Sequence, residues 1–201
     1  MKEKLPKDIR VDHRLICEMI EPDLKVLDLG CGDGELLSLL IKHKGCRGTG
    51  IEINEHAIYK CVAKGLTVSH ADINSGLSDY SDGRFDYVIL NESLQEVLNI
   101  KATILEALRV GKKVVVGVPN FCHFSARLQL FFNGRVPVTE GLPYQWYDTP
   151  NLRFFSIKDF RFFCKENNIS IEKFTAVGRG IEIKFLRNLF AHIGIFLLTK
   201  H

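Results

Sequence analysis

The sequence contains no pair of cysteines at the spacing of a CxxC motif or a metal clip. Its six cysteines are scattered along the chain: Cys17, Cys31, Cys46, Cys61, Cys122 and Cys164. This pattern excludes zinc-binding and thioredoxin-like motifs, which need cysteines at short, fixed spacing. Isolated thiols are typical of a reducing compartment, where cysteine packs as a small hydrophobic residue. We therefore expect a cytoplasmic protein without a metal site.

Long hydrophobic runs and basic clusters are also missing. Residues 1–12 are charged and are not followed by the apolar segment of a signal peptide. The most apolar stretch, residues 185–198, is interrupted by Arg187 and His192, so it falls short of a membrane span. The formal net charge is only +3 and the basic residues are spread along the chain, which argues against a nucleic-acid surface. We expect neither a membrane nor a nucleic acid as partner.

Neither a repeat nor a linker divides the 201 residues, so we expect a single domain over residues 1–201. Short apolar runs predict seven strands, at residues 25–29, 47–53, 66–72, 85–91, 112–119, 169–177 and 192–200. Helical patterns occupy residues 10–20, 34–43, 54–64, 102–109, 123–132 and 157–167. Short strands without strict alternation, separated by helices, are typical of a parallel sheet covered on both faces. The fold class expected is α/β, with a doubly wound, mostly parallel seven-stranded sheet.

The most informative run is VLDLGCGDGELL, residues 26–37, where the first strand leads into a helix. Three glycines alternate in it: Gly30, Gly32 and Gly34. A dinucleotide loop with the GxGxxG pattern would need its third glycine at position 35, which holds Glu35. Asp28 and Asp33 flank the loop, so a bound pyrophosphate would meet two carboxylates. The loop therefore suits a ligand with a positive charge, such as an amine or a sulfonium.

This loop, followed by Glu52 at the end of the second strand, resembles the class I S-adenosylmethionine-dependent methyltransferases. The resemblance implies that the glycines let the backbone approach the methionyl part of the cofactor, with Asp28 and Asp33 near its ammonium group. It also implies that Glu52 accepts hydrogen bonds from the ribose and that Asp72 faces the adenine amine. The full set of implied cofactor-binding residues is Asp28, Gly30, Cys31, Gly32, Asp33, Gly34, Glu52, Ile53, Asp72, Ile73 and Asn91. The cofactor half would span about residues 10–119.

A sulfonium is already a good electrophile, so a methyltransferase must align the acceptor and sometimes remove its proton. The candidate bases are His123, Glu92, Tyr144 and Asp148. His123 follows the fifth strand, but a packing or helix-capping histidine is an equally good interpretation. Glu92 is more commonly an exposed acid at a helix start. No pair of these residues has a spacing that forces an acid–base assignment, so the catalytic residues stay open.

The segment VPVTEGLPYQWYDTPN, residues 136–151, contains three prolines, the single tryptophan and two tyrosines, without helical or strand periodicity. Because it follows the fifth strand, we expect it beside the cofactor pocket, within an acceptor or partner side over about residues 120–201. Trp146, Tyr147 and Arg153 are the candidate contact residues of this acceptor or partner side, either in a lid or at a protein interface. Nine of the fourteen phenylalanines lie between Phe121 and Phe163, and we expect them to be core.

Motifs along the whole chain resemble the MetW family of methionine-biosynthesis proteins. They are GCGDGELL, FDYVILNESLQEV, LRVGKKVVVGVPNFCHF, RLQLFFNGRVPVT, LPYQWYDTPN and IKDF, and the resemblance runs from about residue 10 to residue 189. It implies a methyltransferase-like fold and action beside a homoserine O-acyltransferase. Two functions stay open: a cofactor-binding partner of that acyltransferase, and an active small-molecule methyltransferase. An RNA methyltransferase would need a basic stripe, which the sequence does not show.

Overall fold

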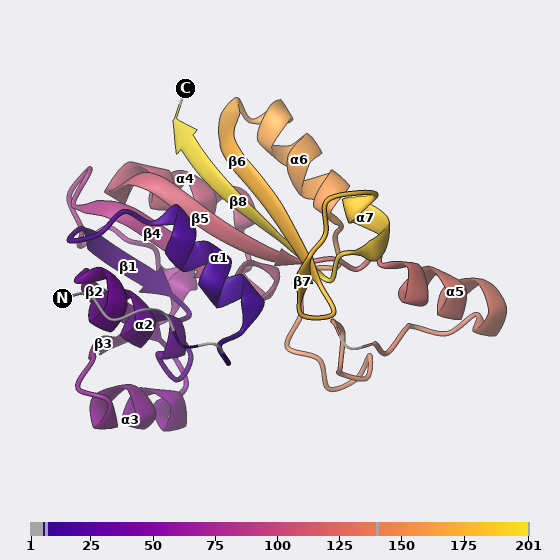
Figure 1. The fold of residues 1–201 in the computed structure, drawn as a ribbon, viewed down its shortest axis with the longest axis horizontal. Coiled ribbons are helices and arrows are strands. Elements are labelled where there is room, and N and C mark those ends of the chain that lie inside the picture. Colours follow the sequence, from indigo (N-terminus) through magenta and orange to yellow (C-terminus); the bar gives the residue numbers. More distant parts are fainter. Residues whose placement is uncertain (1–5, 7, 140, 201) are drawn as a thin grey trace.

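The computed structural model describes residues 6, 8–139 and 141–200. In this part of the chain one sheet holds all the named strands, in the order β3-β2-β1-β4-β5-β8-β6-β7 (Figure 1). The strands are β1 Lys25–Leu29, β2 Arg47–Glu52, β3 Thr67–His70, β4 Phe85–Asn91, β5 Gly111–Pro119, β6 Ile169–Gly178, β7 Ile181–Glu182 and β8 Ile193–Lys200. The predicted α/β class is therefore confirmed.

Strand direction follows the doubly wound pattern. The five strands from β3 to β5 are parallel to their neighbours, whereas β8 runs antiparallel between β5 and β6. The seven predicted strands are all present, and the two-residue strand β7 pairs with β6 at the edge as an unpredicted addition. β3 ends at His70, two residues earlier than predicted, because Asp72 caps a 3-10 helix over Ile73–Ser75.

The helices cover both faces of this sheet (Figure 1). They are α1 Val11–Met19, α2 Glu35–Lys44, α3 Glu55–Ala63, α4 Ile100–Val110, α5 Phe124–Asn133, α6 Ile157–Glu166 and α7 Arg187–Phe190. Side-chain caps fix where several begin: Asn54 accepts from the Ala57 amide, and Ser156 forms a capping box with Asp159. No helix in the described part is long and apolar enough to cross a membrane.

The core has two layers because successive residues of a strand point to opposite faces of the sheet. On one face, α1 and α2 pack over Val26, Ile89 and Val115. On the other, α4 and α6 pack over Leu27, Val88 and Val114. Burial on both faces explains why the strand sequences are continuously apolar instead of alternating.

The helix α5 departs from the core prediction for the phenylalanine-rich region. It extends away from the end of the sheet (Figure 1), and Ala126 is its one buried residue. Phe131 is 81% exposed and Phe132 is 74% exposed, so the prediction of core is wrong for both. It is also wrong for Phe162 of α6 and for Phe154, which are 65% and 47% exposed. Helical spacing shows which residues share a face, but it does not show whether another element covers that face.

Candidate functional site

The glycine loop joins β1 to α2 at the carboxyl edge of the sheet, where open α/β sheets bind ligands. Gly32 has φ +55°, and a Cβ added to it would meet nothing within 4 Å, so its backbone is open to a ligand. Gly34 has φ +76°, and an added Cβ would lie 2.4 Å from Cδ1 of Leu66. The missing side chain of Gly32 therefore lets a ligand approach the backbone of the loop. The missing side chain of Gly34 instead lets Leu66 pack closely against the loop.

Two pockets adjoin this loop and share Gly30 and Glu92. The smaller, of about 190 Å³, is lined by Arg10, His13, Asp28, Gly30, Cys31, Gly32, Asp33, Glu35, Leu36, Asn91 and Glu92. The larger, of about 470 Å³, is lined by Gly30, Glu52, Ile53, Ala71, Asp72, Ile73, Asn74, Glu92, Ser93, Glu96, Val97, Pro150 and Leu152. Every residue that the sequence predicts to bind the cofactor, except Gly34, lines one of these two pockets.

Asp28, at the carboxyl end of β1, is the buried acid of the smaller pocket, with 2% of its surface exposed. Burial, and then the nearby charge of Glu52, raise the pKa of Asp28 to about 7. An ionised carboxylate is costly in such surroundings unless a positive group accompanies it. The chemistry of this pocket therefore suits a ligand that brings an ammonium group.

Glu52, at the end of β2, is held in place by three backbone amides. Its Oε2 accepts from the Gly32 amide at 2.8 Å, and its Oε1 accepts from the amides of Ile53 and Asn54 at 2.9 and 2.8 Å. A carboxylate has about four acceptor positions, so one remains for a further donor. Glu52 lines the larger pocket and can accept a ligand hydroxyl there.

Asp72 and Ile73 also line the larger pocket, at the turn after β3. One oxygen of Asp72 accepts from the backbone amide and the side-chain amide of Asn74, both at 2.9 Å, which fixes the carboxylate. Ile53, Ile73 and Leu152 give the pocket apolar walls. A flat aromatic ring with a polar edge would find both packing surface and a hydrogen-bond acceptor here.

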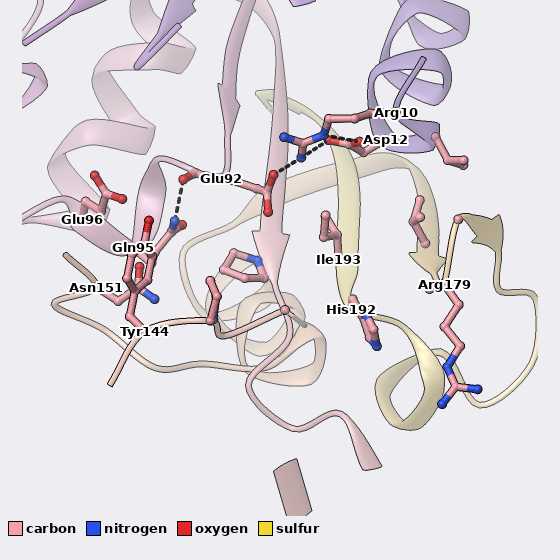
Figure 2. Close-up of a pocket in the computed structure, with 17 residues that line it drawn as sticks. Arg10, Asp12, Glu92, Gln95, Glu96, Tyr144, Asn151, Arg179, His192 and Ile193 are labelled. Atoms are coloured by element: carbon pink, nitrogen blue, oxygen red, sulfur yellow. Dashed lines mark hydrogen bonds and ion pairs between the residues drawn. The ribbon is translucent and has the colours of Figure 1, made fainter. Parts of the chain in front are cut away.

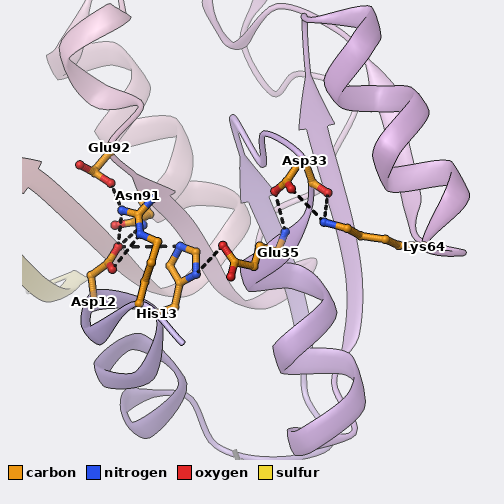
Figure 3. Close-up of polar contacts among 8 residues, drawn as sticks. Asp12, His13, Asp33, Glu35, Lys64, Asn91 and Glu92 are labelled. Carbon is orange, nitrogen blue, oxygen red and sulfur yellow. Dashed lines mark hydrogen bonds and ion pairs between the residues drawn. The ribbon is translucent and has the colours of Figure 1, made fainter. Parts of the chain in front are cut away.

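Two further residues of the smaller pocket, Asp33 and Cys31, are engaged in contacts within the protein. The Asp33 carboxylate lies 3.0 Å from Nζ of Lys64, and this hydrogen bond lowers its pKa (Figure 3). Asp33 thus already has a cationic partner. Burial raises the pKa of the Cys31 thiol, and a Cβ at Gly50 would lie 2.5 Å from its sulfur. Cys31 is therefore a neutral packing residue, as expected for the isolated thiols of this sequence.

The amino end of α1 adds three residues that the sequence did not reveal: Arg10, Asp12 and His13. Arg10 pairs with Asp12 at 2.8 Å and with Glu92, while Asn91 donates to Asp12 at 3.0 Å (Figure 3). Burial opposes the charge of Arg10, but Glu92 and Asp12 outweigh it and raise its pKa. Burial lowers the pKa of His13 despite the nearby Asp12, so its imidazole is neutral at pH 7. The lining of the smaller pocket therefore contains a cation, Arg10, as well as the buried acid Asp28.

Glu92 follows β4 with φ +56°, an uncommon conformation for a residue other than glycine. It lines the two pockets above and a third one of about 550 Å³ (Figure 2). The lining of the third pocket is Arg10, Val11, Asp12, Glu92, Gln95, Glu96, Pro119, Gly141, Pro143, Tyr144, Asn151, Val177, Gly178, Arg179, Gly180, His192 and Ile193. Glu92 is a partly exposed acid just before the 3-10 helix Leu94–Glu96, and it lies where the three pockets meet.

The other candidate residues for catalysis and for acceptor or partner contacts lie in different surroundings. Tyr144 lines the third pocket, whereas His123 caps α5 and its Nδ1 lies 2.7 Å from Oγ of Ser125, outside these three pockets. Trp146 and Tyr147 are each 70% exposed and contact each other edge to face. The remaining two are Asp148, which is exposed, and Arg153, whose amide donates to the Gln95 carbonyl at 3.1 Å. Among the described residues no cluster of histidine, cysteine, aspartate or glutamate could hold a metal ion.

Comparison with known proteins identifies the family. Residues 10–198 match the family described as methionine biosynthesis protein MetW. The chain belongs to the MetW family. A relative of this MetW chain is the bifunctional methionine biosynthesis protein MetXA/MetW of Rhodopirellula baltica, 35% identical over 180 residues. The match covers 84% of this chain and 29% of that protein, so the chain spans less than a third of its relative's length.

Solved structures place this MetW chain among methyltransferase folds. A Thermotoga maritima S-adenosylmethionine-dependent methyltransferase, described as a possible histamine N-methyltransferase, matches with a TM-score of 0.66 and 18% identity. A Pyrococcus horikoshii protein matches with a TM-score of 0.67 and 20% identity. Each match covers 94% of this chain and 87% of the other. At such low identity these similarities show the fold, and not the substrate.

Proposed function

We propose that this MetW chain binds S-adenosylmethionine and acts with a homoserine O-acyltransferase in methionine biosynthesis, in the cytoplasm. The proposed association with the acyltransferase is supported by one observation. The Rhodopirellula baltica relative is named for MetXA and MetW in one bifunctional chain. Proteins that are joined in one organism often associate as separate chains in another. The family resemblance supplies the nature of the partner, a homoserine O-acyltransferase.

The cofactor part of the proposal is supported by the charges around the glycine loop. The buried carboxylate of Asp28 would hold the ammonium group, and Arg10 would face the carboxylate of the methionyl part. Glu52 would accept a hydrogen bond from a ribose hydroxyl, and Asp72 would accept one from the adenine amine. The bound cofactor would supply an electrophilic methyl group, while these side chains would orient it and neutralise its charges.

The test is a pair of measurements on the purified chain. S-adenosylmethionine is titrated in by calorimetry, and the acyltransferase is then assayed alone, with the chain, and with the chain plus cofactor. We expect binding, and an acyltransferase activity that depends on the chain and changes with the cofactor. The Asp28→Asn chain serves as a control that has lost the ammonium site. Binding without any effect on the acyltransferase would contradict the partner role, and absence of binding would contradict the cofactor role.

A second candidate function is small-molecule methyl transfer, favoured by one observation. Glu92 lies between the pockets proposed for the cofactor and the third pocket, at a place suited to a base or an acceptor-positioning group. Strained backbone such as that of Glu92 clusters at functional sites. This function requires that the chain with a small acceptor releases S-adenosylhomocysteine, and that Glu92→Gln slows this release by a larger factor than it weakens cofactor binding.

A further inference from the structure

A fourth pocket, of about 620 Å³, is lined by residues of α5, α6, α7 and the connection before α7, and it gathers positive charge. Its cationic side chains are Arg127, Lys158, Arg161, Lys184 and Arg187. In the part of the chain that the structure describes, none of these five forms an ion pair, and no acid lines the pocket. Lys64, Lys112 and Lys113 elsewhere each pair with a carboxylate. The charge of this pocket is therefore left for another molecule to neutralise.

Two of the cations are held against one aromatic ring. The guanidinium carbons of Arg161 and Arg187 lie 5.6 and 4.9 Å from the ring centroid of Phe174. Arg187 donates through Nε to the Ile183 carbonyl at 3.2 Å, which fixes its orientation and leaves other N–H groups for a ligand. Two guanidinium groups beside the same ring repel each other. A carboxylate next to them would remove this repulsion and could accept from both.

A single residue of α7 connects the helices that carry the cations. Oδ1 of Asn188 accepts from the Lys158 backbone amide at 3.0 Å, and the Asn188 carbonyl accepts from Nη2 of Arg127 at 3.3 Å. The rings of Phe124 and Phe190 also join α5 to α7, with centroids 5.9 Å apart. Figure 1 accordingly shows α7 between α6 and the extended α5. The three helices therefore present one surface, although α5 lies away from the sheet.

Large apolar side chains adjoin the cations on this surface. Those exposed on α5 and on the connection before α7 are Leu128, Leu130, Phe131, Phe132, Phe185 and Leu186. Leu186 also lines the basic pocket, with φ +43°, a strained conformation for a leucine. Arginine and aromatic side chains are the residues enriched where proteins bind one another. Exposed apolar side chains and uncompensated cations on neighbouring elements thus indicate a protein interface.

We propose that α5, α7 and the connection before α7 form the docking surface for the homoserine O-acyltransferase, which presents to them an acidic segment with apolar side chains. The inference rests on the proposed function, and it names the surface on which the partner binds. Charge complementarity argues for this occupant. A second copy of the chain would bring the same basic surface against itself in a twofold interface. A nucleic acid would need the cations to continue along α5, where the exposed residues 130–132 are apolar instead.

The test measures binding of the purified acyltransferase of the same organism to the full chain, by calorimetry at about 50 and 300 mM salt. Lys158→Glu with Lys184→Glu reverses two exposed charges of the pocket. It should weaken binding at least about tenfold and flatten its salt dependence. Phe131→Ser with Phe132→Ser should weaken binding about tenfold and leave the salt dependence unchanged.

Two matched controls lie outside the proposed surface. Lys60→Glu with Lys101→Glu reverses two exposed lysines of α3 and α4, and Tyr59→Ser with Val62→Ser removes two exposed apolar side chains of α3. Both controls should bind the acyltransferase as the wild type does. None of the substituted residues lines a cofactor pocket, so affinity for S-adenosylmethionine should stay the same throughout.

Several results would overturn the inference. Equal affinity of the acyltransferase for the wild type and both surface variants would show that it docks elsewhere, and the proposed partner role would stand. In that case, a dimer of the chain or a complex with single-stranded RNA that only the surface variants disrupt would identify the true occupant. If the wild-type chain and the acyltransferase do not associate at all, the proposed partner role is contradicted and the docking surface with it.

Discussion

Asp28 and Glu92 are both unfavourable for folding, for different physical reasons. Asp28 is a carboxylate removed from water, and its pKa rises to about 7. Glu92 holds a left-handed backbone conformation that costs roughly 1 kcal/mol in a residue with a Cβ. Both side chains line pockets, and neither serves the hydrophobic core. Such costs persist where function needs them, so relieving them should stabilise the chain and impair ligand binding.

Asp28→Asn tests this trade-off through pH. The folded state of the wild type holds a proton on Asp28 up to about pH 7, whereas the unfolded chain releases it near pH 4. The free energy of unfolding of the wild type therefore falls as pH rises from about 4 to 7, and the variant lacks this loss. We expect the ligand-free variant to be more stable at pH 8 by roughly 1–4 kcal/mol, and nearly equal at pH 4.

Denaturant unfolding of both proteins at pH 4, 6 and 8 measures this difference. The same variant should no longer bind S-adenosylmethionine, because a neutral amide cannot pair with its ammonium group. A stability difference that stays constant with pH would show that Asp28 is ionised in the folded chain throughout this range.

The sequence predicted the acids at the strand ends because each lies at a fixed distance from the glycine loop. Asp28, Glu52 and Asp72 all line the predicted pockets. Arg10 could not be found in this way, since it meets Glu92 across 82 positions of sequence through the packing of α1.

At the level of elements, the segment 136–151 is held at its ends and exposed in its middle. Near its start, Gln129 of α5 exchanges two hydrogen bonds of 3.0 Å with the backbone of Val138. After its end, Leu152 donates to the Gln95 carbonyl at 3.0 Å. The rings of Trp146 and Tyr147 lie between these anchors in solvent. This geometry suits a surface that another molecule covers, and the two anchors keep it beside the third pocket.

Trp146→Ala tests the role of this segment. The side chain is 70% exposed and, among the described residues, its ring contacts only that of Tyr147, so the substitution should change the free energy of unfolding by less than about 1 kcal/mol. Affinity for S-adenosylmethionine should also stay the same, because Trp146 lines neither cofactor pocket. Support of the acyltransferase, or acceptor turnover, should weaken severalfold.

The matched control is Phe162→Ala, which removes an aromatic ring of similar exposure from α6. It should leave all three properties unchanged. Loss of cofactor binding in the Trp146→Ala chain, with the fold intact, would contradict the separation between cofactor pockets and segment.

Elements with long apolar patterns were predicted well, and short ones were not. β4 was predicted with its observed bounds, Phe85–Asn91, because its apolar run has clear polar ends. β7 and α7 contain two and four residues, too few for a period to show. The helix α7 positions Arg187 in the basic pocket, so a functional candidate was missed together with its element.

At the scale of the whole molecule, the fold creates a basic surface that the sequence did not suggest. The basic residues are spread along the chain, yet five of them line one pocket of about 620 Å³: Arg127, Lys158, Arg161, Lys184 and Arg187. Among the described residues, no acidic side chain lines it. Sequence spacing could not show this gathering, because the contributing residues come from α5, α6, α7 and the connection between β7 and α7.

The sheet also unites the two halves expected from the sequence, residues 10–119 and residues 120–201. β5 belongs to the first half and pairs with β8 of the second over six residues, from Val114 with Leu198 to Pro119 with Ile193. α6 of the second half packs into the same core as α4 of the first. A chain shortened to end at residue 119 would expose the apolar edge of β5, so we expect it to bind hydrophobic dyes and to melt without a cooperative transition.

In the full chain, the same continuity predicts a single cooperative unfolding unit. Amide hydrogen exchange can measure this, because each strand reports its own opening free energy. Amides of β1 and β8 should exchange through the same global opening, although they belong to different halves. If the amides of β8 exchange through an opening of much lower free energy than those of β1, residues 120–201 unfold independently of residues 10–119. Acceptor and partner binding could then be lost while the cofactor half stays folded.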